Sequence, residues 1–167
     1  LARTSRTPGR TQQIIFFALD GERRLVDLPG YGYAKVSEAI KLEWQRHMAE
    51  FLERRRSLAG LVIVMDIRHP LTDYDRQMLQ WGLARGLPVL LLLAKADKLK
   101  RGAARSTQLA VERTLTASTR DQVRVMPFST LERIGIEPVQ ALLEEWLGSS
   151  GHETARPVDD GSASGGE

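Results

Sequence analysis

Two short segments of the chain place acidic, basic and small residues in an order that suits a phosphate-bearing ligand. In the first, Asp27 follows the apolar pair Leu25-Val26 and precedes a turn that contains Gly30. A carboxylate at the end of a strand can hold the water shell of Mg²⁺, and a glycine N–H can approach a terminal phosphate. An Asp before a Pro-Gly pair is more often an ordinary turn former. The motif therefore needs support from elsewhere in the chain.

The second segment is Lys95-Ala96-Asp97, which follows an apolar run ending at Leu93. A carboxylate can accept hydrogen bonds from the N1–H and the 2-amino group of guanine, which adenine does not offer, and the lysine stem can lie along the base. Hydrogen bonds to a charged group contribute about 1.5–3 kcal/mol, enough for a clear preference. Ser129, after the next apolar run, could offer its backbone N–H to the guanine carbonyl oxygen.

Each of these pieces is also typical of a solvated loop when it stands alone. Their order is more specific than any member: a loop with Thr11, then the Asp27 turn, then Lys95 and Asp97, then Ser129. We therefore interpret the set as one candidate site.

The apolar pattern predicts the elements that would position this site. Continuous apolar runs indicate strands buried on both faces, and apolar residues at helical spacing indicate amphipathic helices. We expect a hairpin of residues 13–19 and 23–28 turning at Asp20-Gly21, a helix from a cap at Ser37 to about Arg55, strands at 61–65, 88–93 and 123–127, and helices from Thr72 or Asp73 to about Arg85, from about Ala103 to Thr116, and from Ile136 to Leu147.

Alternation of strands and helices predicts an α/β fold with a parallel sheet and right-handed crossovers, to which the hairpin adds an antiparallel edge. In such sheets ligands bind beyond the carboxyl ends of the strands. The polar candidates all fall in loops that could share that edge: Thr11, Asp27, Lys95, Asp97 and Ser129.

Composition limits the classes of function. The 167 residues, 42% of them apolar, fit one domain with a sizeable core. The absence of Cys excludes disulfides and cysteine zinc sites, and the longest apolar run, Val89 to Ala94, is too short to cross a bilayer. We expect a cytoplasmic protein without a membrane partner. The net charge of +3 is compatible with RNA or a ribosome, and equally with a solvated basic surface.

The sequence resembles the EngB (YihA/YsxC) family of ribosome-biogenesis GTP-binding proteins, within the translation-factor-related GTPases. The resemblance spans roughly Leu1 to Leu147. The matching stretches are Leu1 to Ser5, Thr7 to Gln12, Leu25 to Ala34, Trp44-Gln45-Arg46, Met65 to Leu71, Lys95 to Leu99, and Phe128-Ser129.

The resemblance implies a Ras-like G domain over residues 1–147, followed by a disordered tail at 148–167. It implies that Thr11 binds Mg²⁺, that Asp27 holds the ion through water, and that the Gly30 N–H contacts the terminal phosphate. Lys95 and Asp97 would read guanine. The full set of implied GTP- or GDP-binding residues is Gly9, Arg10, Thr11, Gln12, Gln13, Asp27, Leu28, Pro29, Gly30, Ala94, Lys95, Ala96, Asp97, Phe128, Ser129 and Thr130.

Three features depart from the general GTPase pattern. The glycine-rich phosphate loop, the strand before it and the helix after it are absent from these residues. They would precede Leu1, so we expect a fragment of a longer protein. Ala94 stands where the family has Thr or Asn. Tyr31 stands where Ras-type enzymes carry the Gln that orients water, a feature of this family too, so hydrolysis should be slow or aided by the ribosome.

The missing strand would lie between the strands that end at Asp27 and Asp66, leaving two open edges. We therefore expect this chain by itself to be unstable, inactive as a GTPase and poor at binding GTP.

By resemblance, the complete protein is expected to be a monomeric GTPase switch that assembles the large ribosomal subunit by binding its rRNA, and that is needed for cell division and septation. The alternative is a nucleotide-free module that docks on RNA through Arg3, Arg6 and Arg10. A glycine-rich Gly-Lys-Ser stretch upstream of Leu1 would favour the switch. An unrelated flavodoxin-like domain is a weaker option, which would leave Lys95 and Asp97 as coincidence.

Overall fold

The computed structural model describes residues 14–28 and 38–148 and contains two separate sheets. The larger is parallel, with the order β3-β4-β5, formed by β3 (Leu61–Asp66), β4 (Val89–Ala94) and β5 (Val123–Pro127). The expected α/β fold is confirmed.

Register fixes which residues meet at the carboxyl ends of these strands. Leu61 pairs with Val89 at the start of β3 and β4, and Asp66 pairs with Ala94 at their ends. On the other side of β4, Leu93 pairs with Pro127. The loops that follow the three strands therefore leave the sheet at the same end, where the carboxyl ends of the strands lie.

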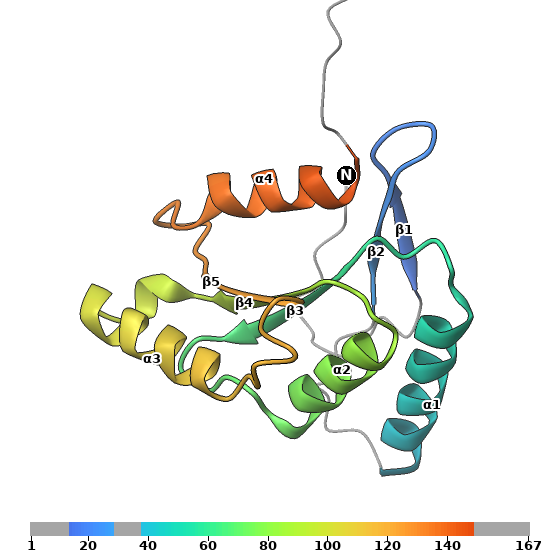
Figure 1. Cartoon of the computed structure of the whole chain (residues 1–167), viewed down its shortest axis with the longest axis horizontal. Coiled ribbons are helices and arrows are strands. Elements are labelled where there is room, and N and C mark those ends of the chain that lie inside the picture. Colours follow the sequence, from blue (N-terminus) through green and yellow to red (C-terminus); the bar gives the residue numbers. More distant parts are fainter. Residues whose placement is uncertain (1–13, 29–37, 149–167) are drawn as a thin grey trace, which may run out of the picture.

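Helices cover both faces of the parallel sheet (Figure 1). α4 (Ile136–Trp146) lies on one face, and α2 (Asp73–Ala84) and α3 (Arg101–Arg113) lie on the other. Alternate residues of β4 face opposite layers: Val89, Leu91 and Leu93 join the α2–α3 core, while Leu90 and Leu92 join a smaller cluster with Val139 of α4. This two-sided burial explains why β4 reads as a continuous apolar run.

Local sequence signals explain the helix bounds. α2 begins after Thr72, whose side chain accepts from the Asp75 N–H, while the buried Asp75 carboxylate accepts from the backbone N–H of Thr72 at 2.8 Å. This reciprocal capping box satisfies N–H groups that the first turn cannot pair internally. α3 begins two residues before and ends three residues before the expected bounds, since Thr114 closes it by donating from Oγ1 to the Val111 carbonyl at 2.7 Å.

The hairpin forms its own sheet of β1 (Ile15–Ala18) and β2 (Arg24–Asp27). The Asp20 carboxylate, rather than glycine geometry, closes the turn, because it accepts from the backbone N–H groups of Glu22 and Arg23 at 2.9 and 2.7 Å. The expected antiparallel pair is present, but it is not hydrogen-bonded to β3, β4 or β5 in the described residues.

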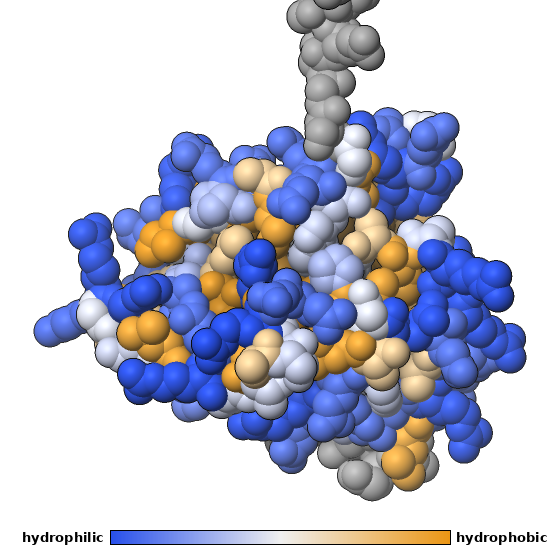
Figure 2. All heavy atoms as spheres, in the orientation of Figure 1, coloured by the Kyte–Doolittle hydropathy of each residue, from blue (hydrophilic) through white to orange (hydrophobic). Residues whose placement is uncertain are grey.

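α1 (Glu38–Arg54) connects the hairpin to the parallel sheet. It buries Met48 and Leu52 in the main core, and Leu28, just after β2, also packs against that core. The Arg85 Nε at the end of α2 donates to the Leu52 carbonyl at 3.1 Å, which joins α1 to α2. In the orientation of Figure 1, polar and charged side chains cover most of the surface, with apolar patches between them (Figure 2). Within residues 14–28 and 38–148, the helices fall short of the length and apolarity that crossing a membrane requires.

Candidate functional site

The carboxyl ends of the three parallel strands are joined by backbone hydrogen bonds. The Ile67 N–H donates to the Ala94 carbonyl at 2.9 Å and connects the end of β3 to β4. The Ala96 N–H donates to the Phe128 carbonyl at 3.0 Å, and the Phe128 N–H to the Leu93 carbonyl at 2.8 Å. The loops after β3, β4 and β5 are therefore joined to one another at the carboxyl end of the parallel sheet.

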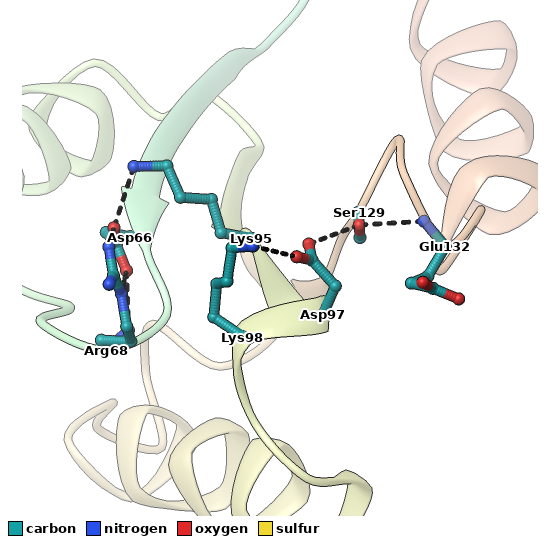
Figure 3. Close-up of polar contacts among 7 residues, drawn as sticks. All are labelled: Asp66, Arg68, Lys95, Asp97, Lys98, Ser129 and Glu132. Carbon is teal, nitrogen blue, oxygen red and sulfur yellow. Dashed lines mark hydrogen bonds and ion pairs between the residues drawn. The ribbon is translucent and has the colours of Figure 1, made fainter.

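The turn after β4 sends two charged side chains in opposite directions (Figure 3). Lys95 has a left-handed backbone with φ 59°, and the short 3-10 helix η1 (Ala96–Lys98) follows it. From this turn Lys95 reaches toward the end of β3, and Asp97 points toward the loop after β5. The predicted base-reading pair therefore lies where the sequence placed it, beyond the carboxyl end of β4.

The Asp97 carboxylate is held in place by two neighbours. The Ser129 hydroxyl donates to its Oδ1 at 2.6 Å, and Lys98 Nζ lies 3.2 Å from Oδ2. Its side chain is 10% exposed. The Ser129 hydrogen bond, with a smaller contribution from Lys98, lowers the pKa of Asp97, so the group is an anion at neutral pH. An ionised carboxylate has about four acceptor sites, which leaves capacity for two base N–H donors.

Ser129 takes part through its hydroxyl, which corrects the sequence interpretation. Its backbone N–H, which we expected to be free for a base, donates to the Ile134 carbonyl at 3.0 Å, and Ile134 returns a bond at 2.9 Å. The Ser129 hydroxyl also accepts from the Glu132 N–H at 3.3 Å. The loop after β5 is thus closed on itself and presents its serine side chain to Asp97.

Gly135 ends this loop in a conformation that favours glycine. Its φ is +72°, and a Cβ built there would lie 2.2 Å from the Pro127 carbonyl oxygen. The close approach of backbone to backbone fixes the path from β5 into α4.

Asp66 also lies at the carboxyl end of the sheet, and the sequence analysis assigned no role to its side chain. Arg68 grips it with Nε at 2.9 Å from Oδ1 and Nη2 at 2.6 Å from Oδ2, and Lys95 Nζ reaches Oδ2 at 3.0 Å. The bidentate Arg68 contact is the main cause of a pKa of Asp66 well below its ordinary value. The signal in the sequence was an acid at the end of a buried strand.

The remaining residues predicted to lie beside the base are also at the carboxyl end of the sheet. Ala94 is the last residue of β4, the Phe128 side chain packs against the α4-side cluster, and Thr130 is exposed in the loop after β5.

The predicted metal and phosphate residues divide between the described and undescribed parts. Asp27 is exposed at the carboxyl end of β2, next to the half-buried Leu28. The others lie outside the described residues: Gly9, Arg10, Thr11, Gln12, Gln13, Pro29 and Gly30. Residues 14–28 and 38–148 contain no group of three or more His, Cys, Asp or Glu side chains arranged to hold a metal.

Comparison with known proteins assigns the family. A family model described as a 50S ribosome-binding GTPase matches residues 1–95. The probable GTP-binding protein EngB of Nitrosococcus oceani is 55% identical over 151 residues, which cover 90% of this chain and 75% of that protein. This chain belongs to the EngB family of GTP-binding proteins.

Solved structures agree with the fold. The crystal structure of a probable GTP-binding protein engB superposes with a TM-score of 0.68 at 18% identity, covering 87% of each chain. Translation elongation factor SelB from Methanococcus maripaludis, in complex with a GTP analogue, gives a TM-score of 0.62 at 15% identity over 84% of this chain and 29% of that one. The Ras-like arrangement predicted from the sequence is therefore confirmed.

Proposed function

We propose that this chain carries the guanine-reading half of a GTPase switch whose complete protein acts in assembly of the large ribosomal subunit. The observation that carries the proposal is that Asp97 meets Ser129 beyond the carboxyl ends of β4 and β5, on the same turn that carries Lys95. Family membership supports guanine nucleotide as the ligand. The ribosomal partner and the roles in cell division and septation rest on the family resemblance.

In this proposal the Asp97 carboxylate accepts from N1–H and the 2-amino group of guanine. Ser129 fixes the orientation of the carboxylate, and the low pKa of Asp97 keeps both oxygens available as acceptors. Lys95 lies beside the base. Adenine offers no matching pair of donors, so the geometry favours guanine by the strength of charge-assisted hydrogen bonds, about 1.5–3 kcal/mol.

Mg²⁺ would be held at the other half of the site. Asp27 supplies an exposed carboxylate at the carboxyl end of β2, an oxygen donor of the kind that Mg²⁺ prefers alongside substrate phosphates. Thr11 would supply a second oxygen. A bound ion would neutralise phosphate charge, and the Asp27 carboxylate would hold it through water.

The phosphate loop would come from a segment outside these residues, as would a strand between β2 and β3. The division into two sheets supports this, as do the exposed apolar side chains on the strands that would flank the gap, with Leu25 49% and Val64 62% exposed. We expect residues 1–167 alone to bind GDP weakly and the full-length gene product to bind it well. A cooperative melt of residues 1–147 with micromolar GDP binding would contradict this.

The decisive experiment is an Asp97→Asn substitution in the full-length gene product. The amide replaces one acceptor with a donor, so binding should shift from guanosine to xanthosine triphosphate, whose 2-oxo group accepts. Fluorescent-nucleotide titration measures both constants, and Asp121→Asn, an exposed residue at the amino end of β5, is the matched control. An unchanged preference in Asp97→Asn refutes the base reader, and RNA binding without nucleotide binding would favour the RNA-docking module.

A further inference from the structure

We propose that Asp66 is a positioning residue for Lys95: it anchors the lysine ammonium from the neighbouring strand and so holds the lysine stem in place for the base. This inference rests on the proposed function, because it assigns how one residue of that site is pre-ordered. Asp66 itself is not placed in contact with the nucleotide.

The first support is the register of the sheet. Asp66 and Ala94 are paired residues of the parallel strands β3 and β4, and Lys95 is the next residue of the chain. The backbone bond from Ile67 to Ala94 locks these ends together. The lysine therefore starts from a fixed point directly beside the acid, and its Nζ reaches Asp66 Oδ2 at 3.0 Å.

The second support is that Asp66 is itself immobilised. Arg68 contacts both carboxylate oxygens through its guanidinium, and its backbone N–H donates to Oδ1 at 3.0 Å. The Asp66 side chain is only 17% exposed, whereas those of Arg68 and Lys95 are 46% exposed. A half-exposed lysine is thus tied to a mostly covered, doubly held anion.

The third support is the direction of the two charged side chains in Figure 3. The left-handed backbone of Lys95 allows it to turn toward β3 while Asp97 turns toward Ser129. Each side chain has its own anchor, Asp66 for the lysine and Ser129 for the aspartate. The site is braced on both sides of β4.

Bracing matters most for the lysine, since its stem has several rotatable bonds. An unanchored stem would have to be ordered when a base arrives, and that ordering weakens binding. An anchored stem has already been ordered by folding. The cost of immobilising one such side chain corresponds to about a twofold to tenfold change in affinity.

The test is a double-mutant cycle on nucleotide affinity in the full-length gene product, using Asp66→Asn, Lys95→Met and the double variant. Asp66→Asn alone should weaken GDP binding about twofold to tenfold. Added to Lys95→Met, it should have no further effect, because methionine has no ammonium to anchor. An equal loss in both backgrounds means that Asp66 merely supports the fold, and no loss in either also overturns the inference.

A second measurement needs no nucleotide. The ¹⁵Nζ relaxation of Lys95 should show a slow, ordered ammonium in the parent protein and a mobile one in Asp66→Asn, with Asp121→Asn as the control. An ammonium that is equally mobile in all three overturns the anchor. The two proposals fail separately: an unchanged guanine preference in Asp97→Asn removes the base reader, whereas the relaxation result judges Asp66 alone.

Discussion

The parallel sheet and the hairpin differ greatly in how deeply their side chains are buried. In β4, Val89, Leu90, Leu91 and Leu93 are fully buried, with helices on both faces. In the hairpin, Phe16 is 44% exposed, and the Arg55 guanidinium that follows α1 lies 5.2 Å from its ring centroid. The difference places the proposed base-reading residues on a rigid support and the metal-binding candidate Asp27 on a lightly packed one.

This contrast indicates how the two halves of the site depend on their surroundings. The half proposed to read the base is held by hydrogen bonds among β3, β4 and β5, all within the described residues. Among the described residues, the hairpin is held by the pairing of its two strands, by the Leu28 contact with the core and by the Arg55 contact with Phe16. We therefore expect recognition of the base to depend little on segments outside these residues. Binding of the phosphates should depend strongly on such segments.

The strongest test of the contrast removes one leucine from the parallel sheet and one from the hairpin. Leu91→Ala should lower the free energy of unfolding by about 2–5 kcal/mol, because it leaves a cavity in a fully buried strand. Leu19→Ala, at an exposed position where β1 enters the hairpin turn, should cost about 1 kcal/mol or less. Urea denaturation of both variants measures the difference. Equal losses would mean that the hairpin is as deeply packed as the parallel sheet.

A second test concerns the loop that carries Ser129. Gly135→Ala should cost about 1–3 kcal/mol more than Gly86→Ala, because both glycines have positive φ but only Gly135 has a backbone oxygen where the new methyl group would lie. Thermal melts give the stabilities. Equal costs would show that the loop after β5 can shift freely.

The smallest expected effect is on the stability of the fold at acid pH. The Arg68 ion pair depresses the pKa of Asp66, and backbone N–H groups of Arg23 and Glu22 lower that of Asp20 to about 2. Since each folded-state pKa lies below the unfolded value of about 3.9, each group stabilises the fold above that pH and loses its contribution as pH falls below it.

Substitution should therefore flatten the fall in melting temperature below about pH 4. Asp66→Asn should flatten it more than Asp20→Asn, because the Asp66 side chain is 17% exposed and that of Asp20 37%. Melting curves between pH 2 and 5 compare the variants with the parent. A larger effect at Asp20 would contradict the stronger attachment of the parallel sheet.

Much of the fold could be predicted from local patterns. The continuous apolar runs specified β3, β4 and β5 to within a residue or two, and Thr72 marked the start of α2. These signals are local, because they depend on burial period and on capping chemistry within a few residues. The loop that carries Lys95 and Asp97 could be placed for the same reason, because it follows directly on the apolar run of β4.

Contacts between distant residues were not predictable in this way. The pairing of Asp66 with Lys95 depends on strand register, and the closure of Ser129 on Ile134 depends on the path of a loop. Neither leaves a periodic trace in the sequence. The separate hairpin sheet is also a tertiary outcome, since the sequence of a strand does not specify which sheet the strand joins. The nucleotide-binding and metal-binding roles of all the site residues, the domain bounds and the tail stay predictions, and residues 149–167 lie outside the described chain.

The parallel connections also set the order in which the chain can fold during synthesis. The hairpin closes over neighbouring residues and can form within about 1–10 μs of emerging. β3, by contrast, must wait for α2 and β4, and β4 must wait for α3 and β5. At about 5–20 residues per second, these waits last seconds, during which apolar strands are exposed to other chains. A nascent protein stalled before Val123 should therefore be the form that chaperones hold most strongly.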